Sequence, residues 1–251
     1  MKSKLLLAAT AVVLLSVSAC KEKIKNCKLG KAYITNGSST PNPNTFFYNE
    51  DGSLSKIKYS NENVDSLVYS ADTLWVITRD YRDSVVAIFK GIKNADNNVV
   101  SGVLTGYDFM GGVSSTDNYN MTYNADGTLD GQNISNGGGS VIYSYSYDNG
   151  NRVGGKKFVG ATETENYIFF HSKVENKSGI DDWNKVFTPY FGKPSANLLD
   201  SAWTITNGDT IRVTYNHTLD ANDYVTKTVQ TYLSPGFQTK YYTYQYFDCK
   251  E

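Results

Sequence analysis

Residues 48–54 read Tyr-Asn-Glu-Asp-Gly-Ser-Leu, and residues 123–129 read Tyr-Asn-Ala-Asp-Gly-Thr-Leu. In both stretches a tyrosine ends an extended segment, a group rich in Asn, Asp and Gly follows, and a leucine opens the next segment. Asn, Asp and Gly tolerate positive φ or hydrogen-bond their own backbone, so they reverse the chain within a few residues. The repeated stretch therefore predicts a β-hairpin turn that recurs along the chain.

The segments between these turns alternate as half-buried strands do. Looser copies of the turn lie at 93–99, 147–153 and 216–225. Every second residue is aromatic or branched in several segments, which predicts strands at 74–78, 85–89, 140–147, 167–170, 203–206, 211–215 and 240–247. Successive strands joined by short turns form an antiparallel up-and-down meander, and a long meander must curl to hide its edges. We expect an all-β fold curled into a barrel or half-barrel.

One stretch departs from this pattern. Residues 180–187 place apolar side chains at helical spacing after an aspartate that could cap a helix. We expect one short helix or crossover near 181–188. The aromatic residues within and just after it, Trp183, Tyr190 and Phe191, allow two interpretations. They face a ligand, or they cover an open end of the core as clustered aromatic residues commonly do.

The N-terminus has the features of an export signal. A basic start and an apolar run to about residue 17 precede Ser18-Ala19-Cys20. The run is too short for a permanent membrane helix. The stretch resembles the bacterial lipobox, whose cysteine takes a diacylglycerol and becomes the new N-terminus. We expect a removed signal at 1–19, a lipidated tether at 20–26 that anchors the chain to a membrane, and a single domain at 27–251. The alternative is an ordinary signal peptide with an incidental cysteine.

Composition bounds the class of protein. The chain has 251 residues, 20 of them Tyr and 21 Gly, with 24 Lys and Arg against 25 Asp and Glu. A formal net charge of -1 offers no electrostatic reason to bind nucleic acid. Lipidation of Cys20 would leave Cys27 and Cys249 in a compartment where disulfides persist. We predict that Cys27 and Cys249 pair; two unpaired thiols are the alternative.

Motifs for chemistry are not found in the sequence. His171 and His217 have no cysteine or histidine partner at metal-ligand spacing. Residues 137–140 read Gly-Gly-Gly-Ser without the lysine of a phosphate loop, and residues 124–127 lack the later glutamate of a calcium loop. We therefore predict no catalytic residue, no metal and no cofactor.

Several stretches carry a family resemblance. The Tyr-Asn-x-Asp-Gly-[Ser/Thr]-Leu turns resemble the tyrosine–aspartate repeats of bacterial surface proteins. Residues 190–193, 197–198, Tyr215 and 223–227 are similar to an uncharacterised family of lipoproteins from Bacteroidota. The resemblance implies an antiparallel β domain with a porin-like shape and supplies no active site. The chain departs from the family at 222–224, where Asn-Asp-Tyr replaces Asp-Gly-Tyr.

A modification motif also recurs. Asp followed by Ser or Thr and an apolar residue is similar to the O-glycosylation acceptor of exported Bacteroidota proteins. The implied acceptors are Ser66, Thr73, Ser84, Ser201 and Thr210. Each triplet also opens an expected strand, where such residues end a turn, so an unmodified structural role is the alternative.

Location and role follow from these expectations. Residues 21–26 are mostly basic, whereas surface-export signals in this phylum are acidic, so we expect the periplasmic side of the outer membrane. Lys, Asp, Asn and Thr interrupt the strands, which disfavours a membrane-spanning porin. We expect a non-catalytic binding or scaffolding protein whose partner is a glycan or an envelope protein. A purely structural lipoprotein and a glycan-acting hydrolase are the alternatives, and the oligomeric state is left open.

Overall fold

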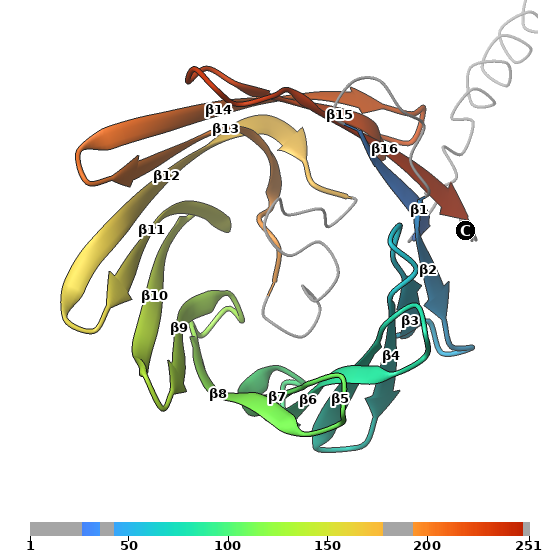
Figure 1. Ribbon diagram of the computed structural model, residues 1–251. Helices are drawn as coiled ribbons and strands as arrows, with labels where there is room; N and C mark the ends of the chain where they lie inside the picture. The colour runs from blue at the N-terminus through green and yellow to red at the C-terminus, as the bar shows by residue number, and fades with distance from the viewer. Residues whose placement is uncertain (1–26, 36–42, 178–192, 248–251) are drawn as a thin grey trace, which may run out of the picture.

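Sixteen antiparallel strands follow one another around a closed barrel in the computed structural model, which describes residues 27–35, 43–177 and 193–247 (Figure 1). The strands are β1 (Lys28–Thr35), β2 (Asn44–Tyr48), β3 (Leu54–Lys58), β4 (Val64–Tyr69), β5 (Thr73–Arg79), β6 (Val85–Lys93), β7 (Val99–Tyr107), β8 (Val113–Tyr123), β9 (Leu129–Asn136), β10 (Gly139–Asp148), β11 (Asn151–Val159), β12 (Thr162–Glu175), β13 (Asn197–Thr206), β14 (Asp209–Leu219), β15 (Val225–Tyr232) and β16 (Lys240–Phe247). The predicted all-β meander is confirmed. The expected helix or crossover near 181–188 lies outside the described residues.

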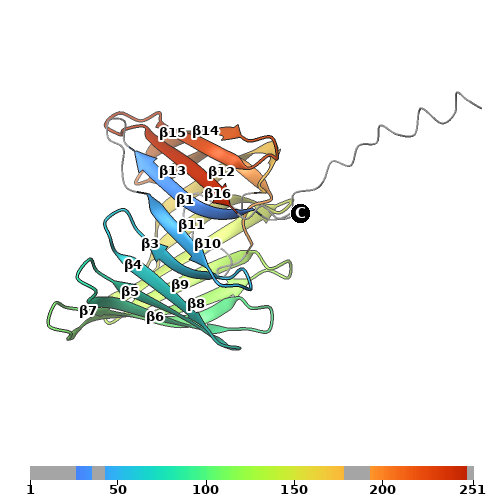
Figure 2. The same ribbon diagram turned by 90° about the vertical axis from the view of Figure 1, so that its right-hand side faces the viewer.

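A seam between the first and last strands closes the barrel. β1 pairs with β16 from Lys28 opposite Phe247 to Thr35 opposite Tyr241, with one register shift between Leu29 and Lys31. All other pairings join neighbours in the sequence. The strands are inclined to the barrel axis, as closure of a sheet requires (Figure 2). The junction of β1 with β2 is short, with Lys31 opposite Thr45 and Ala32 opposite Asn44, and it completes the ring of described strands. In the described ranges no helix is both long and apolar enough to cross a membrane.

Seven turns of the described chain share one backbone pattern. The N–H of the first residue donates to the carbonyl of the fifth, and the N–H of the fourth donates to the carbonyl of the first. The pattern occurs at 49–53, 59–63, 80–84, 94–98, 108–112, 124–128 and 220–224. The fourth residue always has positive φ, from 64° at Asp83 to 88° at Gly52. Asp223 has φ 66°, so the turn at 220–224 keeps the common shape without glycine.

The stretch 147–153 forms a different turn from the one expected of a looser copy. Asn149 has φ 49° and Gly150 has φ 75°. Two consecutive residues with positive φ make the tight type I′ turn that matches the twist of a hairpin. Asn207 and Gly208, with φ 50° and 88°, make the same turn between β13 and β14. The described hairpins therefore include at least two turn types.

The leucine of the repeated motif forms part of an inward ring. Leu54 opens β3 and Leu129 opens β9, and both side chains are buried inside the barrel. Leu74, Val99 and Val225, at or near the starts of other odd-numbered strands, are 1% exposed or less. These residues belong to one apolar cluster. Because the odd-numbered strands all start at the same end of an up-and-down barrel, the cluster lines that end of the lumen.

Tyr48 and Tyr123 of the motif, and Tyr69 before another turn, each bond the neighbouring strand through the hydroxyl. The Tyr69 hydroxyl donates to the carbonyl of Leu54 at 2.5 Å, and the Tyr123 hydroxyl donates to the carbonyl of Val99 at 2.7 Å. Tyr48 donates to the carbonyl of Leu29 at 3.0 Å in the same manner. The motif thus combines a turn, a buried apolar side chain and a hydroxyl bond to the neighbouring strand.

Candidate functional site in the barrel lumen

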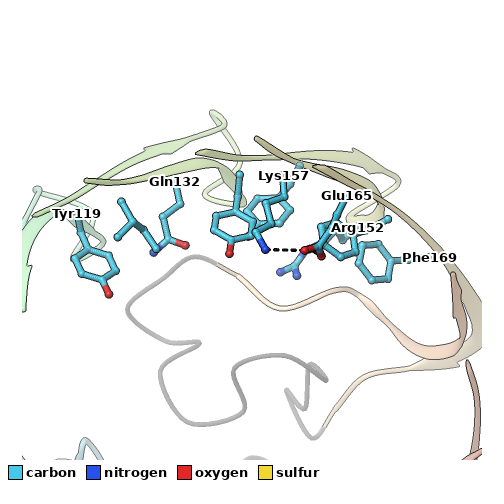
Figure 3. A pocket seen from close by; sticks show the side chains of 10 residues that line it. Tyr119, Gln132, Arg152, Lys157, Glu165 and Phe169 are labelled. Atoms are coloured by element: carbon cyan, nitrogen blue, oxygen red, sulfur yellow. Dashed lines mark hydrogen bonds and ion pairs between the residues drawn. The ribbon is translucent and has the colours of Figure 1, made fainter. Parts of the chain in front are cut away.

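A cavity of about 380 Å³ lies against the inner wall of five consecutive strands, β8 to β12. Its lining residues are Tyr119, Gln132, Ile134, Tyr143, Tyr145, Arg152, Lys157, Glu165, Tyr167 and Phe169 (Figure 3). The size falls within the range of about 300–1,000 Å³ typical of ligand sites. Five of the ten lining residues are aromatic, so the cavity combines flat apolar surfaces with a few charged groups.

Strand alternation aims these side chains into the lumen. Tyr143 and Tyr145 occupy every second position of β10, and their rings are stacked at 6.5 Å with an interplanar angle of 9°. Tyr167 and Phe169 repeat the arrangement on β12 at 6.3 Å and 14°. The alternating strand predicted at 140–147 is confirmed.

Gly155 opens the space between two of these rings. It lies opposite Tyr145 on one side and opposite Tyr167 on the other. A Cβ at this position would lie 3.0 Å from Tyr145 Cδ1 and 3.0 Å from the carbonyl oxygen of Ser144. The missing side chain therefore lets the Tyr145 ring lie close to the strand. The Arg152 guanidinium lies 4.8 Å from the centre of the same ring, a cation–π contact.

An ion pair lies among the aromatic residues that line the cavity. Lys157 lies directly opposite Glu165, and Lys157 Nζ donates to Glu165 Oε1 at 2.6 Å (Figure 3). The Tyr167 hydroxyl donates to the other carboxylate oxygen. The side chains of Lys157 and Glu165 keep 26% and 23% of their exposure, so the pair remains accessible from the lumen. It offers hydrogen-bond donors and acceptors side by side.

The pKa shifts in the cavity all point away from neutrality. Hydrogen bonds from Lys157 and then from Tyr167 lower the pKa of Glu165, and the bond to Glu165 raises the pKa of Lys157. Burial raises the pKa of Tyr145 to about 12. Burial and the bond to Glu165 raise the pKa of Tyr167. A general acid or base works best with a pKa near the operating pH, so these groups are suited to binding rather than to proton transfer.

The predicted ligand-facing aromatics Trp183, Tyr190 and Phe191 lie outside the described residues, as do Cys20 and Cys249. The lipidation at Cys20 and the bridge between Cys27 and Cys249 therefore stay predictions.

The predicted glycosylation acceptors lie in two kinds of place. Ser84 and Thr210 are exposed beside hairpins, whereas Ser66, Thr73 and Ser201 are half-buried within strands. Thr73 also hydrogen-bonds the turn through Ser70 and Asp72. Modification stays a prediction, and Ser84 and Thr210 are the acceptors to which an enzyme has the best access.

Both histidines bond to the protein itself. His171 Nε2 lies 2.7 Å from the carbonyl oxygen of Arg152, and Nδ1 lies 3.1 Å from that of Asn197. His217 contacts Thr228 Oγ1 at 2.9 Å and the carbonyl oxygen of Leu199 at 2.7 Å. In the described part of the chain no group of three or more His, Cys, Asp and Glu residues is placed to hold a metal ion. The histidines connect strands in this structure.

Sequence reasoning missed the charged half of the cavity. Lys157 and Glu165 stand eight residues apart on either side of a hairpin, which is the spacing that places opposite charges face to face. The spacing of the two charges is visible in the sequence, but the pairing can be predicted only if the hairpin register is known. A bulge between Lys157 and Phe158 shifts that register. Ten residues from five strands converge only once the barrel curvature is known.

Two solved structures share this barrel. A porin-like protein from Bacteroides uniformis ATCC 8492 matches with a TM-score of 0.66 and 16% identity over 89% of this chain and 100% of that chain. A porin-like protein from Bacteroides vulgatus ATCC 8482 matches with a TM-score of 0.65 and 11% identity over the same shares. No protein-family model matches, and no curated protein matches. At this identity the likeness shows the fold.

Proposed function

We propose that this chain is a non-catalytic binding protein of the bacterial envelope, and that its luminal cavity holds an oligosaccharide. The observation that carries the proposal is the pairing of stacked aromatic rings with an accessible ion pair on one inner wall. Aromatic faces pack against the apolar faces of sugar rings. Lys157 and Glu165 supply the donor and the acceptor that neighbouring sugar hydroxyls require.

Several observations support an envelope location. The sequence begins with a basic and apolar signal that ends at Cys20, and the structural neighbours are porin-like proteins of Bacteroides. The outward positions of β8 to β10 are mostly Ser, Thr and Asn, whereas a membrane-spanning barrel presents an apolar band to lipid. The proposed place is therefore beside the outer membrane on its periplasmic side, tethered by the lipid on Cys20. Protease treatment of whole cells tests this: digestion without lysis would place the barrel on the cell surface.

The cavity favours binding over hydrolysis. Glycoside hydrolysis requires a pair of carboxyl groups on either side of the scissile bond. Of the described lining residues, Glu165 is the single carboxylate, and its pKa is lowered rather than raised toward that of a general acid. Tyrosines outside the cavity, such as Tyr69 and Tyr123, have structural roles. In a purely scaffolding protein all the tyrosines would have such roles.

A glycan array with residues 21–251, which contain the complete barrel, tests the proposal. The expected result is a specific oligosaccharide hit whose affinity falls at least about tenfold in Tyr143→Ala, because truncating a central aromatic anchor removes much of the binding energy. Tyr241→Ala is the matched control, since Tyr241 lies on the outer face of β16. A blank array, or equal losses in both variants, would reject luminal glycan binding and favour the scaffolding role.

A further inference from the structure

The outer wall formed by β2 to β7 carries both exposed apolar residues and cations. Buried residues such as Ile57, Leu74 and Phe89 mark the inward positions of these strands, so the alternate positions face outward. The outward positions hold apolar residues with large exposed fractions: Phe47 41%, Val68 53%, Ile92 40% and Val103 38%. Exposed apolar groups gathered on one wall mark an interaction surface.

Cations are interleaved with these apolar residues. Lys56, Lys58, Arg79 and Lys90 occupy outward positions on β3, β5 and β6, and no Asp or Glu occupies an outward position on β2 to β7. Arg79 is neutralised in part by Asp83, 3.7 Å away. We call Phe47, Lys56, Lys58, Val68, Trp75, Lys90, Ile92 and Val103 the basic apolar face.

Cation–π contacts order this face. Lys90 lies directly opposite Trp75, with its Nζ 5.0 Å from the ring centre. Lys56 lies directly opposite Phe47, with its Nζ 4.8 Å from the ring centre. Each lysine therefore covers an aromatic ring with its aliphatic stem and keeps its charge at the outer surface. Aromatic rings beside cations form the arrangement that binds the interface of an anionic bilayer.

Carboxylates adjoin the face only at its two ends. The turns at one end hold Glu50, Asp51, Asp72 and Asp96, and the turns at the other end hold Glu62, Asp80, Asp83 and Asp108. β5 and β6 have 7 and 9 residues, which corresponds to strands about 23 to 30 Å long. The acids are therefore about a Debye length or more from the centre of the wall at physiological salt. In the middle of the face, the charged side chains are therefore all cations.

The geometry points to the basic apolar face as a docking surface for an anionic phospholipid bilayer, on which the barrel lies with its wall against the headgroups. This inference is independent of the luminal site, because the face is on the outside of other strands. The apolar side chains enter the interface while Lys56, Lys58 and Lys90 contact lipid phosphates. Anionic polymers would engage the same lysines, but they would leave the exposed apolar residues in water.

The opposite wall supplies a matched control. β13 and β14 lie across the barrel from β5 and β6 (Figure 1). Trp203 on β13 lies directly opposite Arg212 on β14, whose guanidinium is 4.7 Å from the ring centre, so the aromatic–cation pair is the same. The neighbouring Lys156 forms an ion pair with Glu163 at 2.8 Å, so this wall is less cationic. Trp75→Ala with Lys90→Glu can therefore be compared with Trp203→Ala with Arg212→Glu.

The experiment measures co-sedimentation of unlipidated residues 21–251 with vesicles of phosphatidylcholine and phosphatidylglycerol. We expect binding to these vesicles, little binding to phosphatidylcholine alone, and a loss of about tenfold or more in the β5–β6 variant but not in the β13–β14 variant. Equal losses in both variants, absence of binding, or equal binding to a soluble anionic polysaccharide would overturn the inference.

A second measurement does not depend on loss of binding. Brominated lipids quench tryptophan fluorescence at the membrane interface. With Trp183→Phe and Trp203→Phe, Trp75 is the remaining tryptophan and should be quenched on vesicle binding. With Trp75→Phe and Trp183→Phe, Trp203 should not be quenched. Quenching of Trp203 alone would place the bilayer on the opposite wall.

Discussion

Gly102 lies opposite Gly91 in the pairing of β6 with β7, and the ring of Phe89 covers both positions inside the barrel. A Cβ on Gly102 would lie 2.6 Å from Phe89 Cε2 and Cζ, and 2.9 Å from the carbonyl oxygen of Lys90. Movement of the ring would disturb its edge-to-face contact with Tyr119, whose ring centre is 5.6 Å away. Two glycines and one aromatic side chain therefore fill this part of the lumen together.

We expect Gly102→Ala to lower the free energy of unfolding by about 1–3 kcal/mol, because overpacking forces the ring or the strand to shift. Gly137→Ala is the control, since a Cβ there meets nothing within 4 Å. Urea unfolding followed by circular dichroism compares the two. Equal stabilities for both variants would contradict the close packing of Phe89 on the glycines.

Glu165 makes stability depend on pH. Its pKa is lowered in the folded state, so its contribution is present above its ordinary value of 4.5 and is lost as pH falls through the folded pKa. Wild type should therefore be more stable than Glu165→Gln at pH near 6, and the difference should shrink toward pH near 3. Glu163→Gln, which breaks a more exposed pair, should change stability less. A constant difference for Glu165→Gln across this range would argue against the ion pair.

At the scale of elements, the tyrosine hydroxyl bonds between neighbouring strands can be removed one at a time. Tyr69→Phe and Tyr123→Phe each delete the bond to a carbonyl of the neighbouring strand while keeping the ring. We expect each variant to lose about 1 kcal/mol in unfolding experiments. Tyr241→Phe, on the outer surface, should be nearly neutral. If all three variants behave alike, the hydroxyl bonds do not fasten the hairpins.

The turns and strands could be predicted from the sequence for a physical reason. Positions such as Gly127 require positive φ, and the alternation in 240–247 matches β16 residue for residue. The ends of the longer strands could not be predicted in this way. For example, β12 continues to Glu175 through bulges at Phe170 and His171, which alternation in the sequence does not reveal. The tyrosine bonds also needed the structure, since they join different hairpins.

At the scale of the whole molecule, the closure of the barrel was left open by the sequence and is settled by one pairing. A half-barrel and a barrel have the same local turns. Only the barrel has the pairing of β1 with β16, which joins residues over 200 positions apart in the sequence. The residues that line the luminal cavity are likewise brought together by the closed sheet. Its lining comes from curvature, which is a property of the closed sheet rather than of any one strand.

The disulfide between Cys27 and Cys249 stays a prediction, which the position of the seam in the sequence makes simple to test. Lys28 lies opposite Phe247, so Cys27 is one residue before the last seam pair and Cys249 is two residues after it in the sequence. A bridge between them would close almost the whole chain and stabilise the barrel by about 4–5 kcal/mol in the entropy model. Intact mass without reductant should be about 2 Da below the reduced mass, and reduction should lower the melting temperature. A reduced mass in freshly exported protein would disprove the bridge.

The number of hairpins in the ring sets the width of the lumen. Outside the seam, every described strand pairs with its neighbours in the sequence, and each hairpin contributes its own turn and buried side chain. Adding or deleting one hairpin would change the circumference by two strand spacings, about 9–10 Å, and would leave the seam residues unaltered. Related barrels built in this way would differ in width by whole hairpins, while the turns and pairings of the remaining hairpins stay the same.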